Sequence, residues 1–162
     1  MIRMIATVGG AGYLRPAPGT WGSLVALPLA ALLYAITGPW GVLIGAIVAF
    51  GLGLWATGEM TKGMTDHDPS EIVIDELVGQ WIAVLPILFG AAAAGAPAMA
   101  LWPGWIAAFA LFRLFDIWKP GPVGWADRRG DALGVMMDDV IAGVFAAIGV
   151  TILAGIWHGM VL

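Results

Sequence analysis

The sequence has no cysteine and few charged residues. The absence of Cys among its 162 residues excludes a disulfide framework and a thiolate metal site. Only 11% of the residues are Asp, Glu, Lys or Arg, whereas soluble domains usually carry about 25%. Hydrophobic residues make up 60% of the chain, and the mean hydropathy is +0.92. This composition predicts a membrane protein.

The net charge is also small. It is −4 at neutral pH, which argues against nucleic acid as a partner, because non-specific binding to nucleic acid depends on an excess of Lys and Arg. The length suits one domain, residues 1–162, better than two.

Three long stretches contain no charged residue: residues 16–58, 77–112 and 140–162. A membrane-spanning helix needs about 20 apolar residues. We expect spans over residues 21–36 and 41–57, with a turn at Thr37-Gly38-Pro39-Trp40 between them. Further spans are expected over residues 77–94, from residue 102 toward Arg113, and from Asp138 onward. The predicted fold is all-α, a compact bundle of about five largely apolar, membrane-embedded helices.

The charged residues fall in three clusters, which lie near the N-terminus, at residues 59–76 and at residues 113–139. With five spans, all three clusters lie on the same side of the membrane. Lys and Arg favour the cytoplasmic side. We therefore expect a multi-pass protein whose N-terminus and two charged loops face the cytoplasm.

The densest group of acids lies where the third apolar run begins. At 3.6 residues per turn, Glu71 and Asp75 would lie on one helix face, next to Glu76. Like charges repel at that spacing unless a cation lies between them, and Mg²⁺ prefers oxygen ligands. A second acid pair, Asp138 and Asp139, opens the last apolar run. We expect a site between the starts of these two helices.

Basic side chains occur at the end of the predicted fourth span. Arg113 and Asp116 are i,i+3 neighbours on a helix, and Lys119 follows one turn later. The group is either a structural ion pair or a phosphate site, in which Arg113 and Lys119 bind the anion and Asp116 orients Arg113 or binds metal.

Three further residues are candidates for the same site. Thr20 and Ser23 lie where the first span begins, and they serve either as simple helix caps or in a phosphate cradle. His67, in the first charged loop, is a candidate for proton transfer.

The chain resembles the phosphatidylglycerophosphatase A family of bacterial membrane enzymes in four segments, which occur in the family's order. These are Pro18-Gly19-Thr20-Trp21-Gly22-Ser23; His67-Asp68 with Glu71-Ile72-Val73-Ile74-Asp75-Glu76 and Gly79; Arg113, Asp116, Trp118-Lys119-Pro120 and Pro122; and Gly134, Met136, Asp138-Asp139 and Ala142-Gly143.

The resemblance implies Mg²⁺-dependent hydrolysis of a phospholipid, phosphatidylglycerophosphate, to phosphatidylglycerol in the bacterial inner membrane, with the active site facing the cytoplasm. It implies that Asp75, Glu76, Asp138 and Asp139 are the acidic, metal-binding residues, and that Arg113 and Lys119 face the phosphate. Glu71 and Asp116 are then additional ligands or bases.

The main alternative is a membrane protein that binds or transports cations through the same carboxylates. Transporters bind their ions near the middle of the bilayer. Here the charges gather at the helix ends on one side, which favours an enzyme that works at the membrane surface. A purely structural membrane subunit is a second alternative, but it would not need so many facing carboxylates.

Overall fold

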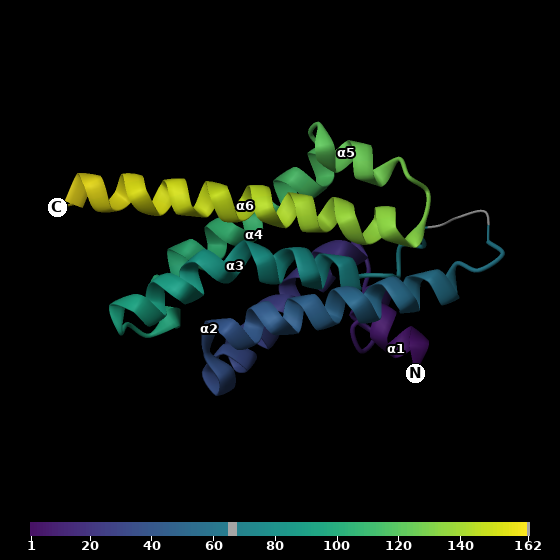
Figure 1. The fold of residues 1–162 in the computed structure, drawn as a ribbon, viewed down its shortest axis with the longest axis horizontal. Coiled ribbons are helices and arrows are strands. Elements are labelled where there is room, and N and C mark those ends of the chain that lie inside the picture. The colour runs from purple at the N-terminus through teal and green to yellow at the C-terminus, as the bar shows by residue number, and fades with distance from the viewer. Residues whose placement is uncertain (65–67, 162) are drawn as a thin grey trace.

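The chain folds into a bundle of helices. The computed structural model describes residues 1–64 and 68–161. Every regular element in these residues is helical, as Figure 1 shows. The elements are α1 (Ile2–Ala6), η1 (Ala11–Tyr13), α2 (Pro18–Met60), α3 (Ile74–Ala94), η2 (Ala98–Leu101), α4 (Trp102–Trp118), α5 (Pro122–Asp127) and α6 (Ala132–Val161). The predicted all-α fold is confirmed.

Helix α2 contains two of the predicted spans. Its backbone leaves the helical region at Gly38 (φ 72°, ψ −172°), and Pro39 follows directly. A positive φ is easy for glycine, and proline has no N–H to continue the helical bonds. The two arms of α2 therefore fold back on each other at the predicted turn (Figure 1).

The bundle has the surface of a membrane protein. Four helical segments of the described chain are long and apolar enough to cross a membrane: α2, α3, residues 98–118 and α6. Since α2 is a hairpin, they supply the five apolar segments that the sequence predicts, and α1 and α5 are short additions. Large apolar side chains such as Ile36, Ile47 and Ile106 point outward and are more than half exposed. An apolar exterior of this extent is typical of contact with lipid.

Helix α3 lies at the centre and packs most extensively against α2 and α6 (Figure 1). Trp81 of α3 donates its indole N–H to the carbonyl oxygen of Ala26 in α2, at 2.9 Å. The α3–α6 crossing depends on two glycines. A Cβ atom on Gly79 would lie 2.6 Å from the carbonyl oxygen of Asp139, and one on Gly143 would lie 2.4 Å from that of Gly79. Small residues let the two backbones approach closely, and this approach brings the acid pairs of the two helices together.

Two helix starts differ from the sequence prediction. Helix α3 begins at Ile74, so Glu71 precedes the helix and the expected alignment of Glu71 with Asp75 on one helix face is wrong. Helix α6 begins at Ala132 rather than at the acid pair. Asp131 accounts for this start, because its Oδ1 accepts the N–H of Gly134 at 2.7 Å, as an N-cap does. Asp138 and Asp139 therefore lie on the second turn of α6.

Candidate active site

An acidic pocket lies where α2 and α3 begin and α4 ends. Its volume is about 220 Å³. The lining residues come from four helices, the residue after α4 and the segment before α3: Pro18, Gly19, Asp68, Ser70, Ile72, Asp75, Glu76, Arg113, Asp116, Lys119, Asp138 and Asp139. Six acidic and two basic side chains are among them, an excess of four negative charges. An anionic substrate would be repelled from this pocket unless a cation entered with it.

Three of the carboxylates converge. Oxygen atoms of Asp75, Glu76 and Asp139 lie within 4.8 Å of one another, and such a group could hold a metal ion. Asp75 is 6% exposed and Asp139 is 3% exposed, so water does little to screen their repulsion. Asp139 Oδ1 is buried and has no hydrogen-bond partner in the described part of the chain. A buried acceptor without a donor, in an all-oxygen group, fits a divalent cation.

Asp138 lies in the same pocket but belongs to a different contact. Its Oδ2 accepts a hydrogen bond from Lys119 Nζ at 3.0 Å. Lys119 also donates to Asp127. Burial works to lower the pKa of Lys119, but the hydrogen bonds to Asp127 and Asp138 outweigh it and raise the pKa above its usual value. The ammonium group therefore remains charged at neutral pH.

Arg113 and Asp116 form the ion pair that their i,i+3 spacing predicts. Arg113 Nη1 lies 2.5 Å from Asp116 Oδ2 and 3.9 Å from Glu76 Oε1. Both side chains of the pair also line the acidic pocket. The structural and phosphate-binding interpretations are therefore compatible. Asp116 holds the guanidinium at the edge of a pocket that an anion could enter.

The hydroxyls expected at the start of α2 do not line the pocket. Helix α2 begins at Pro18 after Ala17, and no side chain caps it, so the prediction that Thr20 or Ser23 caps this helix is wrong. Ser23 is fully buried and donates to the carbonyl oxygen of Gly19 at 2.8 Å. The backbone lines the pocket here instead. A Cβ atom on Gly19 would lie 2.0 Å from Glu76 Oε1 and 3.2 Å from Arg113 Nη1.

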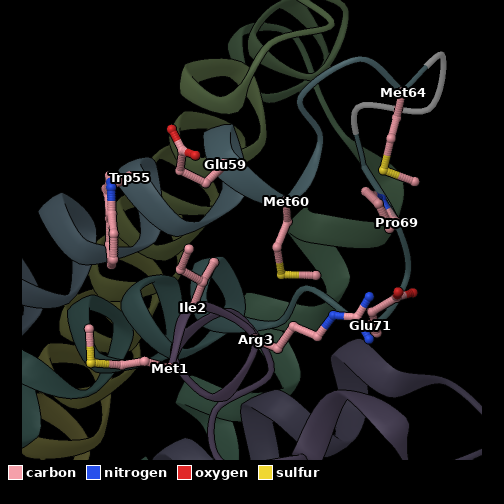
Figure 2. Close-up of a pocket in the computed structure, with 9 residues that line it drawn as sticks. All are labelled: Met1, Ile2, Arg3, Trp55, Glu59, Met60, Met64, Pro69 and Glu71. Carbon is pink, nitrogen blue, oxygen red and sulfur yellow. The ribbon is translucent and has the colours of Figure 1, made fainter.

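Glu71 faces a second and larger hollow. This hollow has a volume of about 650 Å³ and is lined by residues from α1, the end of α2 and the segment before α3 (Figure 2): Met1, Ile2, Arg3, Trp55, Glu59, Met60, Met64, Pro69 and Glu71. Ser70 and Ile72, the two neighbours of Glu71, line the acidic pocket instead. Segment 69–72 thus separates the two hollows, and the structure does not bring Glu71 into the acidic group.

The first charged loop also contributes side chains to the acidic pocket. His67 lies outside the described residues. Asp68 and Ser70 line the acidic pocket, and Arg15 donates to Ser70 Oγ at 3.2 Å. Asp68 belongs to a segment that carries the family resemblance, whereas nothing in the sequence distinguishes Ser70 from a solvated loop residue.

The fold and the pocket define a class: a helical membrane protein with a buried carboxylate group and two basic side chains at one end of its bundle. The family model described as phosphatidylglycerophosphatase A matches residues 4–154. The chain belongs to the phosphatidylglycerophosphatase A family, and it is accordingly a phosphatase.

Individual relatives agree with this assignment. The phosphatidylglycerophosphatase A of Haemophilus influenzae is 39% identical over 91% of this chain and 85% of its own length. The protein of the same name from Escherichia coli is 35% identical over 89% of this chain and 78% of its own length. A Bacteroides thetaiotaomicron protein provisionally named phosphatidylinositol-3-phosphatase is 38% identical over 90% of this chain and 88% of its own length. No solved structure matches the chain significantly.

Proposed function

We propose that this chain hydrolyses phosphatidylglycerophosphate to phosphatidylglycerol and inorganic phosphate, in a reaction that requires Mg²⁺. The observation that carries the proposal is the convergence of Asp75, Glu76 and Asp139 beside Arg113, in a chain whose relatives bear the name of this activity. A phosphomonoester carries about two negative charges, and its hydrolysis spreads charge over the phosphate oxygens. The pocket combines carboxylates that can hold a cation with basic side chains that can bind an anion.

The residues divide into two sets by charge. Asp75, Glu76 and Asp139 would hold Mg²⁺, and Asp138, which lines the same pocket and contacts Lys119, would be a further ligand through its other oxygen. Bound there, Mg²⁺ would neutralise the phosphate and make a bound water more acidic. Arg113 and Lys119 would bind the phosphate oxygens, and Asp116 would keep Arg113 in place through their ion pair.

The place of the pocket suits a lipid. It lies at one end of the apolar segments, so the acyl chains can stay in the bilayer while the head group enters. We propose that this end faces the cytoplasm from the bacterial inner membrane, because all the Lys and Arg residues lie in clusters on this side.

Phosphate release tests the proposal. Purified protein in detergent is given phosphatidylglycerophosphate, phosphatidylinositol 3-phosphate or glycerol 3-phosphate, with Mg²⁺ or with EDTA. We expect release from phosphatidylglycerophosphate in Mg²⁺ and none in EDTA. Faster release from phosphatidylinositol 3-phosphate, which the Bacteroides relative's name makes the second candidate, would reassign the substrate. If none of the three substrates releases phosphate and the protein carries Mg²⁺ across liposome membranes, a transporter would be favoured.

A further inference from the structure

A fully buried glutamine in α3 has no hydrogen-bond partner. Gln80 is 0% exposed. Neither its amide nitrogen nor its carbonyl oxygen bonds to any atom of residues 1–64 and 68–161. Buried polar side chains are nearly always hydrogen-bonded, because burial without a partner loses the bonds that water would make. A polar residue retained inside a membrane-spanning helix also points to a functional site.

Gln80 lies one turn after Glu76 on α3. Residues four apart share a helix face, and long side chains lean back over the preceding turn. The preceding turn here is the one that carries Glu76, whose Oε2 is also buried without a partner among the described residues. The amide N–H of Gln80 thus lacks an acceptor, and Glu76 Oε2, on the preceding turn of the same helix, lacks a donor.

Arg113 adds a third group of the same kind. Its Nε is buried and donates to no acceptor in the described chain. Arg113 Nη1 lies 3.9 Å from Glu76 Oε1, which is beyond hydrogen-bond range. The carboxylate and the guanidinium are therefore neighbours that do not bond directly. A side-chain amide, with both a donor and an acceptor, can bond to each of them.

We propose that Gln80 is a positioning residue of the active site, whose amide N–H donates to Glu76 Oε2 and whose carbonyl oxygen accepts from Arg113 Nε in the loaded enzyme. The proposal rests on the proposed function. With Oε2 held by the amide, Glu76 directs Oε1 to the cation. With Nε held by the carbonyl oxygen and Nη1 paired with Asp116, Arg113 stays apart from Glu76 and keeps its remaining N–H groups for phosphate. Groups that orient metal ligands in this way strengthen metal binding.

The test uses purified protein without substrate, so its readout is independent of catalysis. The melting temperature is measured against Mg²⁺ concentration for the wild type, Gln80→Leu and Gln80→Met. We expect both variants to need about tenfold more Mg²⁺ for half of the stabilisation, in keeping with the loss of a group that orients a metal ligand. Without Mg²⁺ they should melt no lower than the wild type, because a buried amide without partners has been removed.

Thr57→Val is the matched control. Thr57 is also fully buried, and its Oγ1 also has no partner in the described part of the chain, but it lies on α2 and not one turn from Glu76 on α3. Its Mg²⁺ requirement should equal that of the wild type.

Three results would overturn the proposal: an unchanged Mg²⁺ requirement in the glutamine variants, an equal rise in Thr57→Val, or a failure of Gln80→Met to fold. The last would mean that the amide serves the fold, since Met keeps the unbranched shape. Failure of the proposed function has a different signature. The wild type itself would then gain no stability from Mg²⁺ and release no phosphate, and both proposals would fall together.

Discussion

At the scale of single residues, the proposed metal site depends on three acids that converge in one pocket. Asp75→Asn keeps the size of the side chain but removes its charge. We expect phosphate release to fall by about 10²–10³-fold, comparable to the loss of a main electrostatic contributor. The metal-free protein should melt no lower, because a repulsion among Asp75, Glu76 and Asp139 is relieved.

A matched variant distinguishes this effect from a general loss of charge. Glu59→Gln removes a carboxylate from an exposed ion pair with Lys62, on the far side of segment 69–72 from the acidic pocket. It should release phosphate at the wild-type rate. Near-normal turnover of Asp75→Asn at saturating Mg²⁺ would remove Asp75 from the metal ligands and leave Asp138 and Asp139 as the main site.

A substitution of Glu71 tests whether this residue takes part in the reaction. The sequence places it among the catalytic candidates, whereas the structure places it in the neighbouring hollow. We expect Glu71→Gln to keep most of the wild-type kcat and its Mg²⁺ requirement. A loss as large as that of Asp75→Asn, measured under the same conditions, would show that Glu71 acts in the reaction.

At the scale of elements, the α3–α6 crossing determines whether the acid pairs meet. Gly79→Ala would place a Cβ atom 2.4 Å from a ring carbon of Phe112 and 2.6 Å from the backbone oxygen of Asp139. Overpacking of this kind costs about 1–3 kcal/mol. We expect a lower melting temperature together with weaker Mg²⁺ binding, because α6 must move away from α3.

Gly90→Ala is the control for this variant on the same helix. A Cβ atom there meets nothing within 4 Å, and alanine favours helix more than glycine does. Its melting temperature should equal or exceed that of the wild type. If both variants melt alike, the close approach of α3 and α6 does not limit stability.

The helices could be predicted from the sequence, but their exact starts could not. The apolar runs and the turn around Gly38 predicted the helices because lipid demands long apolar segments, and a Gly-Pro pair interrupts them. The helix starts were harder to place. Asp131 caps α6 two turns before the acid pair, and α2 starts without any side-chain cap. Gln80 carries no charge, and so it did not stand out within an apolar run.

The site was predictable in part for the same physical reason. Charged residues are costly next to membrane-spanning segments, so charged residues at those positions are candidates for a functional site. This reasoning identified Asp75, Glu76, Arg113 and Asp139. Which of them touch depends on packing between helices. Lys119 contacts Asp138, and Ser23 points into its own helix. The contact between Lys119 and Asp138 does not follow from spacing along the chain, whereas Ser23 bonds to the carbonyl oxygen four residues before it, as serine commonly does within a helix.

At the scale of the whole molecule, the one-sided charge distribution predicts the orientation in the membrane. Because the chain has no cysteine, single cysteines can report it. Lys62→Cys and Arg128→Cys should react with an impermeant thiol reagent only after cells are opened. Met99→Cys, in the exposed η2 at the opposite end of α3 and α4, should react in intact cells. The reverse pattern would overturn the orientation.

We propose above all that the acidic pocket needs a divalent cation to act on a lipid phosphate. The most direct test of this proposal is the rate of phosphate release from phosphatidylglycerophosphate by the purified protein, titrated with Mg²⁺ after exhaustive removal of metal. We expect no release without the ion, a saturable rise as Mg²⁺ is added, and no such rise in Asp139→Asn. Full activity of the metal-free wild type, or a normal Mg²⁺ titration of Asp139→Asn, would contradict it.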